Sequence, residues 1–105
     1  MLRYEYKSVS VPDGGEKLEV ILSVKEGQKI VLKGLASDGL SGYVNILEVE
    51  GNRVVEWYSE HTAGYGNFIP LLHELEGPLE IKVGASDIGG GAATLNFTLA
   101  YEELE

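Results

Sequence analysis

The chain has 105 residues, enough for one domain around a single core, and we treat residues 1–105 as one domain. It contains no cysteine, which excludes disulfides and thiolate metal sites. Seventeen acidic residues against eight basic ones give a net charge of −9. This balance argues against binding nucleic acid or an anionic membrane, because both need a basic patch.

The start of the chain shows no basic segment followed by an apolar run, so no secretion signal is visible. No apolar stretch approaches the roughly 18 residues that a membrane-spanning helix needs. We expect the protein to be cytoplasmic, or to be part of the virion if its source is a virus. Glutamate outnumbers aspartate 14 to 3, a bias typical of heat-adapted proteins, so we also expect a thermophilic source.

The first half of the chain reads as strands separated by turns. Residues 3–11 form a candidate first strand, which ends at the turn signal of residues 12–15. Residues 17–24 alternate with a period of two, and residues 29–36 follow after a short turn that contains Gly27. We predict that these two segments form a hairpin. The alternation places four residues of the earlier strand on one face: Leu18, Val20, Leu22 and Val24.

The same pattern continues through the middle of the chain. Residues 43–50 and 53–60 flank Gly51 and predict a second hairpin. Residues 68–72 fit a short strand that contains Pro70, which cannot donate to a ladder and therefore belongs on a sheet edge. Residues 71–75 fit a single turn of helix equally well, so both readings stay open.

Two further strands are expected at residues 78–85 and 93–102, both with clear alternation. No run of helical period reaches ten residues, which excludes architectures with parallel strands joined by helices. Three longer connections, at 37–42, 61–67 and 86–92, favour a jelly-roll order over a simple meander. The predicted fold is therefore all-β, an antiparallel β-sandwich of about eight strands that is jelly-roll-like.

In length, strand number and spacing of turns, the chain resembles the small jelly-roll proteins that decorate or build virus particles, often as trimers. This resemblance implies a homo-oligomer whose subunit contacts lie at residues 3–9 and 61–68.

Candidate catalytic and metal-binding residues are few. His61 and His73 lie twelve residues apart, in none of the spacings that bind zinc, and we expect both to be loop or rim histidines. Asp38 and Asp87 lie in turns, where either of them with backbone carbonyls could hold a structural cation. We predict no catalytic residues, no metal site and no cofactor.

The most concentrated chemical feature is aromatic. Trp57 and Tyr58 point to opposite faces of one strand, and we favour the reading in which Trp57 faces the core. Exposed aromatic side chains on a rim serve protein contact or sugar stacking. The candidate interaction residues are Tyr4, Tyr6, Tyr58, His61, Tyr65 and Phe68. The candidate stacking residues, under the alternative, are Tyr43, Trp57, Tyr58 and Tyr65.

These observations favour a non-catalytic structural or assembly module that binds copies of itself or joins a larger protein assembly. The alternative is a module that binds a carbohydrate or a small ligand. An enzyme is not expected, because a jelly-roll enzyme would need a cluster of inward-facing histidines and a carboxylate.

Overall fold

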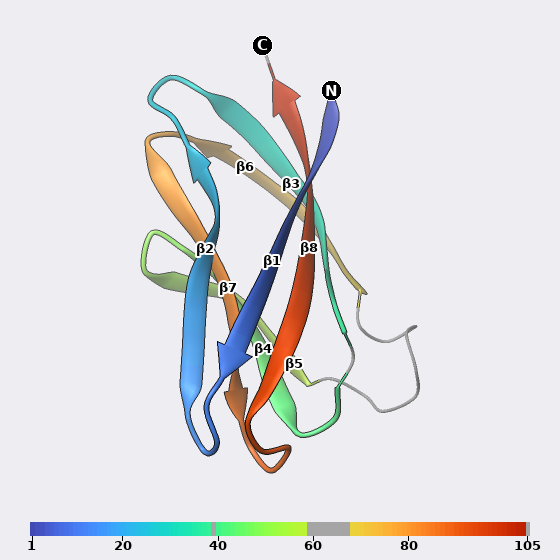
Figure 1. The fold of residues 1–105 in the computed structure, drawn as a ribbon. Helices are drawn as coiled ribbons and strands as arrows, with labels where there is room; N and C mark the ends of the chain where they lie inside the picture. The colour runs from blue at the N-terminus through green and yellow to red at the C-terminus, as the bar shows by residue number, and fades with distance from the viewer. Residues whose placement is uncertain (39, 59–67, 105) are drawn as a thin grey trace.

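Eight strands form the secondary structure of residues 1–38, 40–58 and 68–104, which this computed structural model describes. They are β1 (Leu2–Val11), β2 (Glu16–Val24), β3 (Lys29–Ser37), β4 (Tyr43–Val49), β5 (Asn52–Tyr58), β6 (Phe68–Glu76), β7 (Leu79–Asp87) and β8 (Ala93–Leu104). They build two four-stranded sheets (Figure 1). The first sheet has the order β1-β8-β3-β6, and the second sheet has the order β2-β7-β4-β5.

The strand order is that of a jelly roll. Antiparallel pairs nest along the chain: β1 pairs with β8, β2 with β7, β3 with β6, and β4 with β5. A long hairpin that is wound around a sandwich gives this nesting, because its two arms stay paired while the chain crosses between the sheets. The predicted antiparallel β-sandwich of about eight strands is therefore confirmed.

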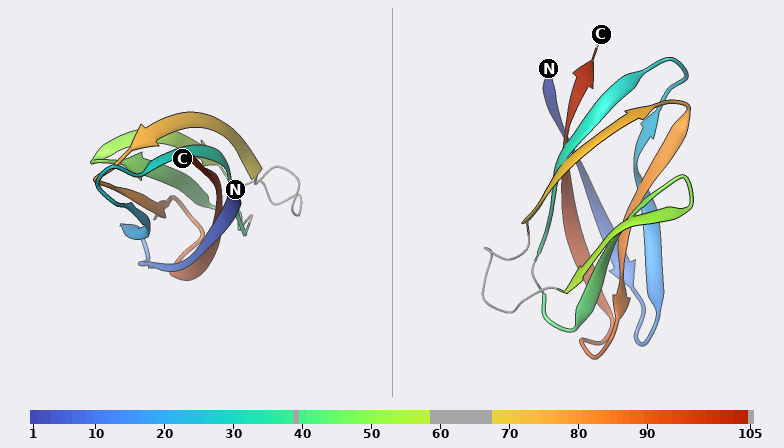
Figure 2. Two further views of the ribbon diagram at one scale, coloured as in Figure 1. Left: turned by 90° about the horizontal axis from the view of Figure 1, so that it is seen from above. Right: turned by 180° about the vertical axis from the view of Figure 1, so that it is seen from behind.

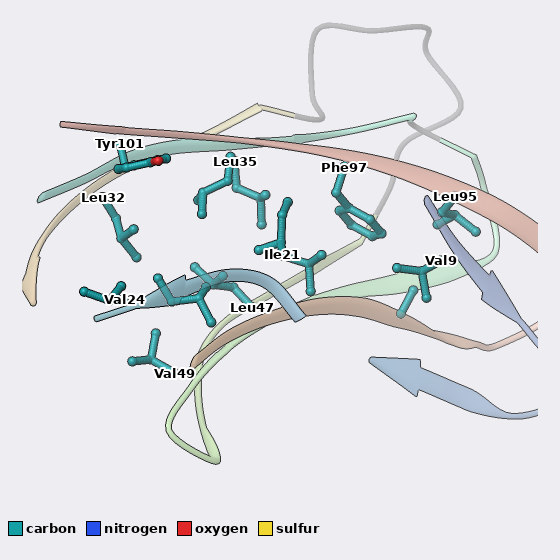
Figure 3. Packing of buried hydrophobic residues seen from close by; sticks show 14 of the residues in the cluster. Val9, Ile21, Val24, Leu32, Leu35, Leu47, Val49, Leu95, Phe97 and Tyr101 are labelled. Atoms are coloured by element: carbon teal, nitrogen blue, oxygen red, sulfur yellow. The ribbon is translucent and has the colours of Figure 1, made fainter. Parts of the chain in front are cut away.

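The hydrophobic core lies between the two sheets and follows the predicted alternation (Figure 3). On β8, Leu95, Phe97 and Leu99 are completely buried, and on β7, Ile81 and Val83 are completely buried. Successive side chains of a strand point to opposite faces. The other side of β8 therefore faces away from the core, which positions the surface described below.

The predicted hairpin between residues 17–24 and 29–36 is wrong. β2 belongs to the second sheet and β3 to the first, so the turn around Gly27 carries the chain from one sheet to the other. A short turn with glycine shows where the chain reverses. It does not show whether the two strands share hydrogen bonds, because the partner strands β7, β6 and β8 lie far along the sequence.

The predicted inward face of β2 also needs correction. The register against β7 shifts between Val20 and Leu22, which places a β-bulge at Ile21. A bulge inserts one extra residue and reverses the alternation beyond it. Leu22 and Val24 therefore lie toward the core as predicted, and Ile21, predicted to face away from it, is buried there as well. Leu18 and Val20 are the residues that were wrongly placed, because they pair with Gly84 and Lys82 on the side of β7 that faces away from the core.

Residues 68–76 form the edge strand β6, so the strand reading is confirmed and the helical turn at 71–75 is wrong. Pro70 lies on this edge strand, as its missing N–H requires. The strand is longer than predicted because β3 pairs with it as far as Glu76.

The predicted hairpin around Gly51 is confirmed, since β4 pairs with β5 across it. Both ends of the described chain lie at the same end of the sandwich (Figure 2), where the backbone N–H of Glu103 donates to the carbonyl of Met1. No helix in the described part of the chain is long and apolar enough to cross a membrane.

Candidate interaction surface

The outer face of the first sheet carries two rows of uncharged side chains that run across all four strands. Directly opposed residues of antiparallel strands share a face, so the register gives these rows. The rows are Tyr4–Ala100–Gly34–Pro70 and Tyr6–Thr98–Ala36–Phe68, in the order β1, β8, β3, β6. We call these eight residues the aromatic face.

Large side chains stand on the two edge strands of the aromatic face, and small ones lie on the two central strands. The exposed fractions are 62% for Tyr4, 65% for Tyr6 and 53% for Phe68, which are high values for large side chains. Gly34, Ala36, Thr98 and Ala100 lie between them. The surface is therefore low in the centre and raised at both edges.

Phe68 leans toward the central strand β3. A Cβ atom built on Gly34 would lie 2.5 Å from the Cζ atom of Phe68, so the ring occupies the space above the glycine. The aromatic ring thus covers backbone that a side chain would otherwise cover. This contact ties the β6 edge of the aromatic face to its centre.

Polar side chains that hydrogen-bond to Asn96 of β8 border one end of the aromatic face. The hydroxyl groups of Tyr6 and Ser8 both donate to its Oδ1, the former at 2.9 Å. Its backbone N and its Nδ2 both donate to Asp38 Oδ2, at 2.8 Å each. The network fixes the ring of Tyr6 and uses the carboxylate of Asp38 as a hydrogen-bond acceptor.

Charged side chains border the other end of the aromatic face. The next row across the sheet is Leu2–Glu102–Val31–Glu74, and Lys33 lies in the bulge of β3 beside Gly34. The aromatic face is therefore an uncharged centre between charged and polar borders.

The predicted interaction residues do not all lie together. The register places Tyr4, Tyr6 and Phe68 on the aromatic face. Tyr58 is 64% exposed and pairs with Val44 on the second sheet, opposite in parity to the inward-facing Trp57. It therefore lies on the outer face of the other sheet. His61 and Tyr65 lie outside the described residues.

The candidate stacking residues are also separated. Tyr43 is 1% exposed, and its hydroxyl donates to the carbonyl of Gly91. Burial raises the pKa of Tyr43, and the charges of Asp87 and Asp13 add to the effect. Trp57 packs against the core, as the favoured reading expected. Among the described candidates only Tyr58 is largely exposed, and it lies on the outer face of the second sheet, so Tyr43, Trp57 and Tyr58 do not share one exposed surface.

Asp87 braces the loop that follows β7. Its Oδ1 accepts hydrogen bonds from the backbone N–H groups of Gly89, Gly90 and Gly91, and its Oδ2 accepts one from Gly14 at 2.7 Å. These backbone donors, that of Gly14 first, lower the pKa of Asp87 to about 2. The carboxylate therefore holds two loops together by accepting four backbone hydrogen bonds.

The structure shows a surface that residue spacing alone did not. The sequence pattern marks the alternate residues of β8, such as Asn96 and Thr98, as an outward polar side. Only the sheet order shows that Tyr4 and Phe68 flank them on either side. The sequence feature that could have indicated this surface is the run of small outward-facing residues on β8, which ends at Ala100. Among the described residues, no group of three or more His, Cys, Asp or Glu side chains could hold a metal ion.

Comparison of the sequence with protein-family models and with curated protein sequences finds no match. Among solved structures, the fold is similar to a chain of the cyanophage Pam1 capsid asymmetric unit, with a TM-score of 0.56, 16% identity and coverage of 99% of this chain and 85% of that one.

Two further similarities have lower scores. The nucleoplasmin-like N-terminal domain of Drosophila FKBP39 gives a TM-score of 0.47 at 13% identity, over 97% of this chain and 91% of that one. A family 35 carbohydrate-binding module from Clostridium thermocellum gives 0.41 at 15% identity, over 85% and 71%. The similarity to the capsid chain shows a shared fold, that of a two-sheet jelly roll.

Proposed function

We propose that this protein is a non-catalytic structural module that assembles with copies of itself or within a larger protein assembly, of the type that decorates or builds virus particles. The observation that carries the proposal is the aromatic face. It exposes Tyr4, Tyr6 and Phe68 around an uncharged centre on the outside of the first sheet. Exposed aromatic side chains with a polar border are typical of protein interfaces.

The fold supports the same proposal. The solved structure reported above with a TM-score of 0.56 is a capsid chain, and the similarity extends over 99% of this protein. Many functions share the jelly roll, so the fold raises the expectation of assembly without identifying a partner. Under this proposal the protein acts in the cytoplasm or in a virion, and neither nucleic acid nor membrane is its partner.

Light scattering of the purified chain at high concentration tests the proposal. Masses above that of the 11.4 kDa monomer support it, and the resemblance to virus-decorating proteins implies three copies. A protein that stays monomeric at every concentration and enters no particle would contradict it.

The carbohydrate-binding alternative is tested separately. A glycan array and the emission spectrum of Trp57, recorded with and without polysaccharide, give its two readouts. Since Trp57 packs against the core, we expect an unchanged spectrum and no glycan signal.

A further inference from the structure

We infer that the free edge of β1 binds an extended, basic segment of a partner protein, which adds a further strand to the first sheet. The inference rests on the proposed role in a larger protein assembly and names the contact that joins the chain to it. Its basis is the hydrogen-bonding pattern of β1, which stands at the edge of its sheet and, within the described chain, pairs with β8 alone.

The backbone of β1 directs the polar groups of every second residue away from β8. The amino group of Met1 donates to the carbonyl of Glu103 at 3.2 Å, and the N–H of Glu103 donates to the carbonyl of Met1 at 3.0 Å. Hydrogen-bonded and non-hydrogen-bonded pairs alternate along an antiparallel ladder. The residues whose N–H and C=O groups point to the open side are therefore Leu2, Tyr4, Tyr6, Ser8 and Ser10. No backbone hydrogen bond from another described residue reaches them.

A row of free backbone groups is complementary to another extended strand, which offers the same groups at the same spacing. The other three edge strands interrupt this row. β2 has its bulge at Ile21, and β6 contains Pro70. The ladder of β5 with β4 shifts register after Leu47. Bulges and prolines on an edge prevent a further strand from pairing. The ladder of β1 runs through ten residue pairs without a shift or a proline, so β1 is the edge on which an added strand pairs best.

The side chains and charge of the chain define the chemistry of the segment. Tyr4 and Tyr6 lie on the outer face, where aromatic or β-branched residues of the segment would pack beside them. The alternate residues Arg3, Glu5 and Lys7 point to the opposite face, so the segment needs polar side chains at its alternate positions. The net charge of −9 favours a segment with net positive charge and disfavours a second copy at this edge.

Amide hydrogen exchange of the full chain, followed by NMR with and without a synthetic peptide, tests the inference. The peptide is as long as the ten-residue β1 and alternates valine with lysine. The control peptide has the same side chains but is methylated at every backbone nitrogen, so it cannot donate hydrogen bonds.

Two variants of the chain complete the design. Tyr4→Pro removes an N–H that points away from β8, and Tyr4→Thr removes the same ring but keeps that N–H. Comparing the two separates the backbone contribution from that of the ring. Thermal melts confirm that both variants are folded, and the methylated peptide keeps the test decisive if Tyr4→Pro does not fold.

Without peptide, we expect the amides of Tyr4 and Tyr6 to exchange at least about tenfold faster than those of Glu5 and Lys7, which bond to β8. The valine–lysine peptide should slow the exchange of the first two amides at least about threefold. Tyr4→Pro should raise the dissociation constant of the peptide at least about fivefold relative to Tyr4→Thr.

A peptide that leaves the Tyr4 and Tyr6 amides unprotected at about 1 mM overturns the inference, as does a methylated peptide that binds equally well. Protection of these amides that grows with protein concentration, in the absence of peptide, assigns the edge to a second copy and overturns the choice of partner. Light scattering distinguishes these failures from failure of the proposed function. A chain that associates or enters a particle while these amides stay exposed leaves the proposed function standing.

Discussion

The ring of Phe68 on the edge strand β6 occupies the space that a side chain on Gly34 of β3 would need. The Cζ atom lies 2.5 Å from an ideal Cβ at that glycine, whereas the backbone carbonyl oxygen of Ile69 lies at 3.4 Å. A methyl group at position 34 would therefore displace only the far end of the Phe68 side chain, which is half-exposed. The glycine and the ring act as one unit of the aromatic face.

We expect Gly34→Ala to displace Phe68 without breaking the sheet. The ring can turn into solvent, and alanine restricts the unfolded chain more than glycine does, so the free energy of unfolding should change by less than about 1 kcal/mol. Nuclear Overhauser contacts between the ring and β3 should disappear, and self-association should weaken. A loss of more than about 3 kcal/mol in chemical denaturation would show that the ring cannot move.

Asp87 makes the loop after β7 sensitive to acid. Its folded pKa of about 2 lies below the ordinary value of 3.8, so the charged carboxylate stabilises the fold fully above about pH 4. That contribution is lost as the pH falls from about 4 toward 2. We therefore expect Asp87→Asn to melt at a lower temperature than the wild type at pH 7, with the difference shrinking to near zero by about pH 2.

Asp13→Asn is the control for this pH dependence, because it removes the same charge from the neighbouring turn. Its melting temperature should follow that of the wild type across the titration. An Asp87→Asn difference that stays constant between pH 7 and pH 2 would contradict the role given to the charged carboxylate.

The alternation on β8 gives a matched pair of stability tests. Leu99 is completely buried, and we expect Leu99→Ala to lower the free energy of unfolding by about 2–5 kcal/mol. Its neighbour Thr98 lies on the outer face, where Thr98→Ala should cost no more than about 1 kcal/mol. Urea denaturation of both variants checks the assignment of the two faces, and equal losses would be inconsistent with it.

Local pattern was enough to predict much of the fold. The alternation of Phe97 and Leu99 with Thr98 identifies a half-buried strand, because a period of two has no other common cause. The opposite parity of Trp57 and Tyr58 follows from the same rule, and the structure agrees with the inward placement of Trp57.

Features that depend on contacts distant in sequence could not be predicted this way. The turn at Gly27 would have the same sequence whether the strands on either side of it, β2 and β3, paired with each other or with strands about 60 residues away. The bulge at Ile21 is defined only against β7. For the same reason, Tyr4 and Phe68 could be named as candidates but not placed on one surface, since β8 and β3 lie between them.

The salt dependence of self-association tests the central claim most directly. An apolar contact between two chains that each carry a net charge of −9 is opposed by repulsion, which salt screens. Sedimentation equilibrium at low and at high sodium chloride should show average masses that rise above 11.4 kDa with protein concentration, and rise further at high salt. A mass that stays at 11.4 kDa throughout, or association that weakens as salt is added, would contradict the account.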